Sequence, residues 1–245
     1  MTTNPKPKIL VLDIETKLTE VYTFSIRDTH ITHKQIKDLD ASARTIHCVG
    51  YKWLGDKRAT VLSEWEHGYS GMIQRTHALL SEADAVVTYN GASFDIPKLN
   101  GQFMLEGIPL PPPLTQIDLY KAARKLGFIC NKLDYIAQIM GLGSKVKHPG
   151  LEMWIACLNG DAKAQKRMAK YCAGDISLTE EVYARLIPYI SDHPHLGETD
   201  RDSCGACGSS RLQSRGVRRT KAMFIARHQC QACGSWSSGK RTKAA

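Results

Sequence analysis

The stretch Lys8-Ile9-Leu10-Val11-Leu12-Asp13-Ile14-Glu15-Thr16 is an apolar run that ends in two acids. Because a strand covered on both faces is almost continuously hydrophobic, the run predicts a buried strand with its carboxylates at the exit. Side chains two residues apart in a strand share a face, so Asp13 and Glu15 would repel each other unless a cation lies between them. A divalent metal ion is the natural candidate. Two acids solvated at a strand end would give the same isolated pattern.

The length of 245 residues and the hydrophobic content of 42% indicate one good-sized core and a small appendage. The N-terminal residues lack the apolar region of a signal peptide, and no apolar run approaches the roughly 18 residues that cross a bilayer. We therefore expect a monomeric cytoplasmic protein that does not contact membranes.

The basic character of the chain is concentrated in its tail. The formal net charge is +9, and residues 199–245 hold ten Lys and Arg against two acids, which leaves +1 for residues 1–198. A compact basic segment points to a polyanion such as nucleic acid, and a few scattered charges that serve solubility are the alternative.

The same tail carries two C-x-x-C pairs separated by 22 residues. Each pair can supply half of a tetrahedral Zn²⁺ site, and the alternating residues 212–229 between them predict a hairpin, as in a zinc ribbon with one structural Zn²⁺. Two disulfides are the alternative, which a reducing cytosol disfavours. Because the interval is slightly long, His228 in place of one cysteine stays open. The four expected ligands are Cys204, Cys207, Cys230 and Cys233.

The order of the expected elements favours an α/β fold in which helices flank a mixed sheet. After the first strand we expect strands at residues 21–26, 45–53, 59–63 and 85–89, and helices at 71–84, from 95 to about 107, and over most of 131–189. This α/β domain would cover residues 1–190, followed by a polar linker at 191–203 and a basic zinc-ribbon domain at 204–245.

Two further acids follow where the first pair would need them. Asp95 lies at a predicted strand-to-helix junction, where side chains converge on a cleft. Tyr171 and Asp175 are four residues apart on a predicted helix and share one face. Taken singly, Asp95 fits a helix cap and Asp175 a solvated helix acid. Together with the first pair they can enclose two Mg²⁺ ions about 4 Å apart, the arrangement that supports phosphodiester hydrolysis.

Three motifs in this chain resemble those of the DEDD-type 3′–5′ exonucleases, which share the ribonuclease H-like fold. They are D-x-E at residues 13–15, N-G-x-x-F-D-x-P at 90–97 and Y-x-x-x-D at 171–175, and the resemblance covers about residues 8–190. It implies that Tyr171 orients the attacking water, as in the tyrosine subclass, since the histidine subclass requires His where Lys170 stands. It also implies four ligands for two Mg²⁺ or Mn²⁺ ions, namely Asp13, Glu15, Asp95 and Asp175.

The order of the first segments is similar to that of stand-alone bacteriophage exonucleases, which are close to the proofreading domains of family B polymerases. For a phage protein the location would be the host cytoplasm. By this resemblance Asn90 and Phe94 contact the terminal nucleotide, although ordinary core packing is the alternative for Phe94. Asp118 resembles a further acid of the group, with a role outside direct metal contact.

These features predict a two-metal 3′–5′ exonuclease that releases nucleoside monophosphates from single-stranded or 3′-ended DNA. The basic residues of the tail, which stand among aromatic residues, suit backbone contacts and base stacking, and we assign Arg218, Arg219 and Lys221 to DNA. The same site acting on RNA, or as a structure-directed endonuclease, is one alternative. Another is a binding protein whose zinc ribbon recruits a replication or transcription partner.

Overall fold

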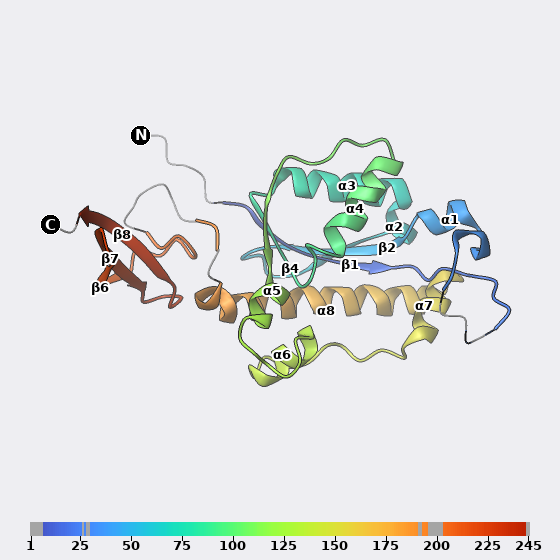
Figure 1. The fold of residues 1–245 in the computed structure, drawn as a ribbon. Coiled ribbons are helices and arrows are strands. Elements are labelled where there is room, and N and C mark those ends of the chain that lie inside the picture. The colour runs from blue at the N-terminus through green and yellow to red at the C-terminus, as the bar shows by residue number, and fades with distance from the viewer. Residues whose placement is uncertain (1–6, 26, 28–29, 191–192, 196–202, 244–245) are drawn as a thin grey trace.

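The computed structural model describes residues 7–25, 27, 30–190, 193–195 and 203–243. A layered α/β part comes first, and a small separate sheet lies beyond the C-terminal end of the longest helix (Figure 1). Most of the linker predicted at residues 191–203 lies outside the described residues. Among the helices that are described, none combines the length and the apolar character needed to span a membrane.

The centre of the α/β part is a mixed sheet of five strands in the order β3-β2-β1-β4-β5. β1 pairs antiparallel with β2 and parallel with β4, so the sheet changes direction at its central strand. The strands are β1 (Ile9–Thr16), β2 (Ile46–Trp53), β3 (Thr60–Ser63), β4 (Ala85–Thr88) and β5 (Thr115–Asp118). The predicted mixed sheet flanked by helices is confirmed.

The central strand β1 is covered on both faces. Leu10 and Leu12 pack into a cluster that contains Phe103, and Val11 packs on the opposite face with Val182. Burial of each such side chain contributes about 1.5–3 kcal/mol, which explains why the run before Asp13 is continuously apolar.

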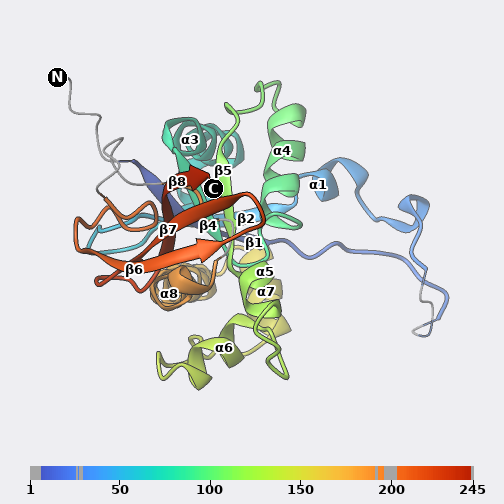
Figure 2. The ribbon, with the colours of Figure 1, turned by 60° about the vertical axis from the view of Figure 1, so that its left-hand side comes forward.

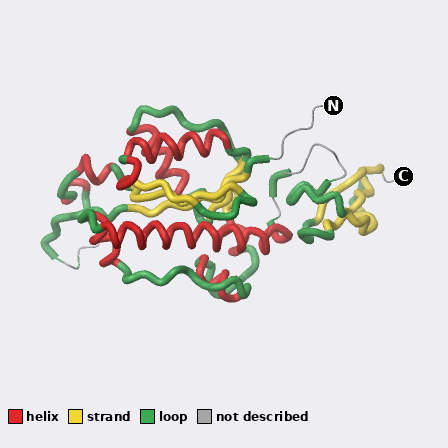
Figure 3. Tube along the Cα trace, turned by 180° about the vertical axis from the view of Figure 1, so that it is seen from behind, coloured by secondary structure: helices red, strands yellow, loops and turns green. Residues whose placement is uncertain are grey.

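Helices cover the two faces of the sheet as separate layers (Figures 1 and 3). α3 (Tyr69–Glu82) and α4 (Asp95–Leu105) lie on one face, and the long α8 (Ala162–Leu186) crosses the other. The remaining helices are α1 (Leu39–Ala43), α2 (Glu64–His67), α5 (Leu119–Arg124), α6 (Leu133–Ile139) and α7 (Leu151–Leu158), with 3₁₀ turns at His33–Gln35 and Ile187–Tyr189.

A glycine lets α8 approach the sheet closely. Gly50 pairs with Asp13 across the β1–β2 ladder. A Cβ at this position would lie 2.7 Å from Cys172 Sγ and 2.8 Å from Ile176 Cγ1, so no larger residue fits between β2 and the helix. The close packing brings the middle of α8 next to the end of β1.

The strand predicted at residues 21–26 is wrong. In the part of this segment that the structure describes, Val21 forms a single bridge with Ile36, and Tyr22 and Phe24 are exposed. Alternating residues form a stable strand when one face is buried against a core, whereas the described residues 21–25 are all exposed.

The C-terminal sheet has three antiparallel strands, β6 (Leu212–Arg219), β7 (Met223–Cys230) and β8 (Trp236–Lys243). β6 and β7 are the predicted hairpin. β8 escaped prediction because its sequence, WSSGKRTK, has no apolar alternation and no buried residue. The sheet lies past the end of α8, to one side of the α/β layers in Figure 1, and Figure 2 brings its three strands to the front.

Candidate active site and candidate metal centre

The two acids of β1 point to the same side of the sheet near the end of the strand. Carboxylate oxygens of Asp13 and Glu15 and the sulfur of Cys172 all lie within 4.8 Å of one another. Asp13 is partly exposed, whereas Glu15 is buried. The alternative of two acids solvated at a strand end therefore does not describe this pair.

Asp95 is hydrogen-bonded directly to the same strand. It is the first residue of α4, it is 2% exposed, and its Oδ1 accepts a hydrogen bond of 2.9 Å from the backbone N–H of Ile14. Because Ile14 stands between Asp13 and Glu15, this bond places the third carboxylate beside the first two.

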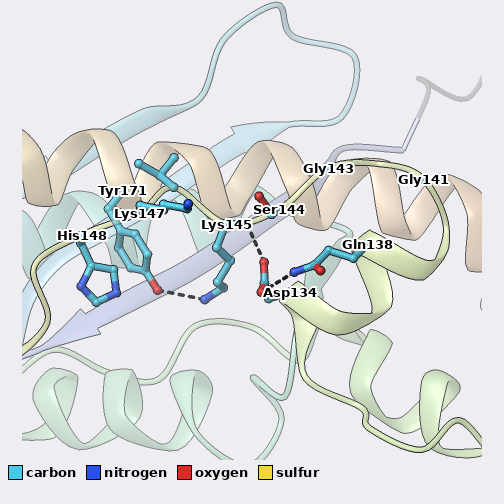
Figure 4. A pocket seen from close by; sticks show the side chains of 10 residues that line it. Asp134, Gln138, Gly141, Gly143, Ser144, Lys145, Lys147, His148 and Tyr171 are labelled. Carbon is cyan, nitrogen blue, oxygen red and sulfur yellow. Dashed lines mark hydrogen bonds between the residues drawn. The ribbon is translucent and has the colours of Figure 1, made fainter.

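The middle of α8 adds the fourth carboxylate, and a loop places a cation beside it. Asp175 is buried, and its Oδ2 lies 2.6 Å from Nζ of Lys145. The same amine donates to the hydroxyl of Tyr171 at 3.0 Å, as Figure 4 shows. The loop before α7 supplies Lys145 and is held by the backbone N–H of that residue, which donates to Asp134 Oδ1 at 2.7 Å. Lys145 was missed from the sequence because no motif marks it.

The four carboxylates, which we call the acid cluster, repel one another. Burial, followed by the neighbouring carboxylates, raises the pKa of Asp13 well above its usual value. Burial and then the charge of Asp175 raise the pKa of Glu15 to about 8. Burial also raises the pKa of Asp95 to about 6, although the N–H of Ile14 opposes this change. The cluster as folded therefore favours protons or cations near its oxygens.

Lys145 offsets part of this repulsion. Burial raises the pKa of Asp175, and the Lys145 ammonium acts in the opposite direction. Burial by itself would lower the pKa of Lys145, but Asp175 and Tyr171 outweigh it and the net pKa is raised. Burial raises the pKa of Tyr171 to about 12. Near pH 7 the site thus holds a charged amine and a neutral phenol.

The acid cluster fits divalent metal ions. Its ligands are hard carboxylate oxygens, which Mg²⁺ and Mn²⁺ prefer. Asp175 Oδ1 is buried without a hydrogen-bond partner among the described residues, and a bound cation would supply that missing interaction.

Asn90, Phe94 and Asp118 border the cluster. Asn90 has a left-handed φ of 68°, and its N–H donates to Asp118 Oδ1 at 2.8 Å, so Asp118 holds this turn. Coulombic contact with Asp118 also contributes to the raised pKa of Asp95. Phe94 is 40% exposed, with Lys98 Nζ 5.0 Å from its ring centroid, so the core-packing alternative is wrong.

Comparison with protein families identifies the superfamily to which the α/β part belongs. A model described as the RNase_H superfamily matches residues 10–187. The chain belongs to the RNase H superfamily. The predicted ribonuclease H-like fold is thereby confirmed.

A solved structure is similar to this RNase H-like part. It is the family B DNA polymerase from the hyperthermophilic archaeon Pyrobaculum calidifontis, with a TM-score of 0.57 and 20% sequence identity. The similarity covers 75% of this chain and 25% of the polymerase chain, so this chain spans about a quarter of that protein. At this identity the likeness concerns the fold. A search of curated proteins finds no match.

A second group of ligand side chains lies in the C-terminal sheet. Sulfur atoms of Cys204 and Cys233 are 3.6 Å apart, those of Cys207 and Cys230 are 3.7 Å apart, and all four lie within 4.8 Å of one another. Tetrahedral Zn²⁺ with Zn–S bonds of about 2.3 Å requires sulfurs about 3.8 Å apart, whereas a disulfide bond is about 2.05 Å long. This cysteine cluster fits Zn²⁺ without His228, which is not a member of the group.

Two matching turns build the cysteine cluster. In each, the first cysteine accepts from the N–H of a glycine four residues later, at 2.7 Å for Cys204 and Gly208 and 2.9 Å for Cys230 and Gly234. Both glycines have left-handed φ angles, 71° and 81°. Burial raises the pKa of Cys230, but the N–H groups of Cys233 and Ala232 outweigh it and lower the pKa to about 7, which favours the thiolate that binds metal.

The basic residues assigned to DNA are exposed but do not share one face of the sheet. Arg218 and Arg219 are neighbours in β6, so their side chains leave opposite faces of the sheet. Arg219 lies with its guanidinium carbon 4.9 Å from the ring centroid of Phe224. Lys221 lies in the turn between β6 and β7. None of the three borders the acid cluster.

Proposed function

We propose that the protein is a metal-dependent 3′–5′ exonuclease of the DEDD type that hydrolyses DNA and releases nucleoside monophosphates. The observation that carries this proposal is the meeting of four carboxylates from three segments within an RNase H fold, with one buried oxygen left unpaired at Asp175. A structural role is a poor explanation for four acids whose pKa values are all raised, in each case mainly by burial.

Two Mg²⁺ or Mn²⁺ ions would be held by Asp13, Glu15, Asp95 and Asp175. When bound, such ions stabilise the negative charge that develops on the attacking and leaving oxygens of the phosphodiester.

Tyr171 and Lys145 would handle the water and the phosphate. Lys145 Nζ donates to the Tyr171 oxygen, and the phenol in turn hydrogen-bonds to Asp175, so the hydroxyl lies beside the acid cluster, where it can orient an attacking water. The charge of Lys145 also attracts the phosphate. Because Lys145 Nζ touches both Tyr171 and Asp175, it positions the phenol relative to the acid cluster.

The positions of Asn90 and Phe94 support hydrolysis at the end of a DNA strand. The exposed ring of Phe94 borders the acid cluster at the start of α4, where it can stack on a base. A terminal base that stacks there would place the last phosphodiester at the carboxylates.

One experiment tests the proposal directly. Single-stranded DNA labelled at the 5′ end should shorten one nucleotide at a time with Mg²⁺, whereas label at the 3′ end should appear at once as a mononucleotide. RNA of the same sequence tests the RNA alternative, and a circular strand tests endonuclease action, since it offers no end.

The matched variants are Asp175→Asn and Glu181→Gln on the same helix. Asp175→Asn should abolish hydrolysis in a folded protein, and Glu181→Gln, an exposed position, should leave it unchanged. Substitution is a cleaner test than a chelator, which would also remove zinc. A folded Asp175→Asn protein with normal turnover would refute the assignment.

A further inference from the structure

The register of the C-terminal sheet sorts its cations onto two faces. Arg218 and Arg241 stand directly opposite Ile225, one on each side of the middle strand. Directly paired residues share a face. The register with β8 shifts between Ile225 and Arg227, but the contact of Arg227 with the ring of Trp236 places Arg227 on the same face. Trp236 pairs with Gln229, the next residue of β7 on this face. We call Arg218, Arg227, Arg241 and Trp236 the basic face.

Contacts within the sheet agree with this sorting. The guanidinium of Arg227 lies 5.7 Å from the Trp236 ring centroid, and its Nη2 donates to the carbonyl of Arg215 at 3.0 Å. Trp236 is nevertheless 54% exposed, so part of its ring stays open to solvent. A large exposed aromatic flanked by arginine is the combination that stacks on bases.

The opposite face of the sheet is turned toward the rest of the molecule. Leu212, Ser214 and His228 of that face line a cavity of about 1520 Å³ together with Ile187 and Pro188. The cavity also reaches the edge strand β8, where Trp236 and Arg241 border it. Arg219 belongs to the opposite face too, where it covers Phe224. Arg218 and Arg227 do not border the cavity, so the part of the basic face on β6 and β7 is turned away from the RNase H-like part.

Charge identifies the kind of partner. Residues 204–245 contain nine Lys and Arg and no Asp or Glu, so no acid competes for the guanidinium groups within this segment. A polyanion with a base to stack satisfies both the cations and Trp236, whereas a protein surface would need acids and an apolar patch.

We propose that the basic face binds single-stranded DNA, with phosphates on Arg218, Arg227 and Arg241 and one base stacked on Trp236. This inference rests on the proposed function only in taking DNA as the substrate. α8 continues eleven residues beyond Asp175, about 16 Å at 1.5 Å per residue, before the chain reaches this sheet. The face would hold the strand at a distance from the acid cluster.

The test is equilibrium binding of the full-length protein to a fluorescent single-stranded oligonucleotide in buffer without added divalent cations. The double variant Arg218→Ala, Arg241→Ala should flatten the log–log salt dependence by about 1.4, at about 0.7 for each lost phosphate contact on single strands. Trp236→Ala should weaken binding by about 10-fold, and Trp236→Phe should retain most of it.

Lys163→Ala is the control, since it removes one positive charge from an exposed position at the start of α8, outside the C-terminal sheet. It should change the dissociation constant by less than about twofold, because its amine does not lie on the proposed path of the DNA strand. Zinc content of each variant confirms that the sheet is folded. Equal losses for Lys163→Ala and Arg218→Ala, or no loss for Arg218→Ala, would overturn the proposal. A protein that binds as expected but cleaves nothing would refute the nuclease function and leave this inference standing.

Discussion

The acid cluster and the cysteine cluster each gather four ligand side chains, but the chain assembles them by opposite routes. The acids come from β1, α4 and α8, segments far apart in the sequence that an extensive core presses together. The cysteines come from two short turns of the same design. The acid cluster therefore depends on a core that folds without it. The cysteine cluster, in contrast, must itself help to stabilise the small sheet that carries it.

Burial supports this distinction. Among residues 203–243 the buried ones are Cys204, Ile225 and Cys230, so the C-terminal sheet has almost no apolar core. A sheet this small gains most of its stability from a bound metal. The RNase H-like part instead has enough buried apolar area to hold four carboxylates together against their repulsion. Metal should accordingly be structural in one cluster and functional in the other.

The largest expected effect comes from substituting two members of the cysteine cluster. Cys204→Ser together with Cys207→Ser should unfold the C-terminal sheet at 25 °C, because structural Zn²⁺ supplies about 10–16 kcal/mol of binding energy in small zinc domains. The RNase H-like part should stay folded. Limited proteolysis, followed by mass spectrometry, would show cleavage confined to residues beyond 203. Cys130→Ser, outside the cluster, is the control, and a protease-resistant tail in the double variant would contradict the comparison.

The next effect is a dependence of stability on pH. The pKa of Glu15 is raised from 4.5 to about 8 in the folded state. Between these values the unfolded chain has lost the proton that the folded chain keeps, so stability is greatest below about pH 4.5 from this group and is lost as pH rises toward 8. Without divalent cations we expect the melting temperature of the RNase H-like part to fall by roughly 5–10 °C between pH 5 and 8.5.

Calorimetry of the full-length protein at several pH values, with and without Mg²⁺, measures this directly. Added Mg²⁺ should reduce the fall, because it binds the ionised carboxylates of the folded state. Stability that rose over this range without Mg²⁺ would show that the acids do not repel one another as the structure indicates.

A smaller effect is expected from neutralising one acid. Glu15→Gln should stabilise the metal-free protein at pH 9 by about 1 kcal/mol, roughly 2–4 °C in Tm, because it removes a buried charge among like charges. Glu181→Gln, exposed on α8, should leave Tm unchanged. A loss of stability in Glu15→Gln would mean that this carboxylate has a structural partner.

Sequence patterns predicted the parts of the fold that local chemistry determines. The apolar run before Asp13 indicated the central strand, since few other elements are buried on both faces. The helix that begins at Asp95 and the strands at Ile46–Trp53 and Ala85–Thr88 lie where periodicity or turn signals suggested them. All four acids were selected from motifs, and the structure gathers them.

What escaped prediction depends on tertiary contacts. Lys145 stands in a glycine-containing loop with no periodic neighbours, and its role is apparent from the distance to Asp175 alone. Arg218 and Arg219 point to opposite faces of the sheet because they are consecutive residues of β6. Which face each residue takes depends on the pairing with β7, which shifts at a bulge between Ser214 and Val217. A strand at residues 21–26 was expected from alternation, but alternation does not show whether a core is available to cover it.

The smallest effect on stability is expected at Tyr171, and it separates the role of a ligand from that of a neighbour. Tyr171→Phe removes the hydroxyl that accepts from Lys145 at 3.0 Å, but Lys145 keeps its ion pair with Asp175. The side chain of Lys145 is also 33% exposed, so water can replace the lost bond, and stability should change by no more than about 0.5 kcal/mol. Mn²⁺ binding, measured by calorimetry, should be unchanged because all four carboxylates remain. Turnover should nevertheless fall roughly 10- to 100-fold, since the hydroxyl is the group proposed to orient water. Loss of Mn²⁺ affinity in Tyr171→Phe would instead make the hydroxyl part of the ion site, and the acid cluster would then need a fifth ligand where the cysteine cluster needs four.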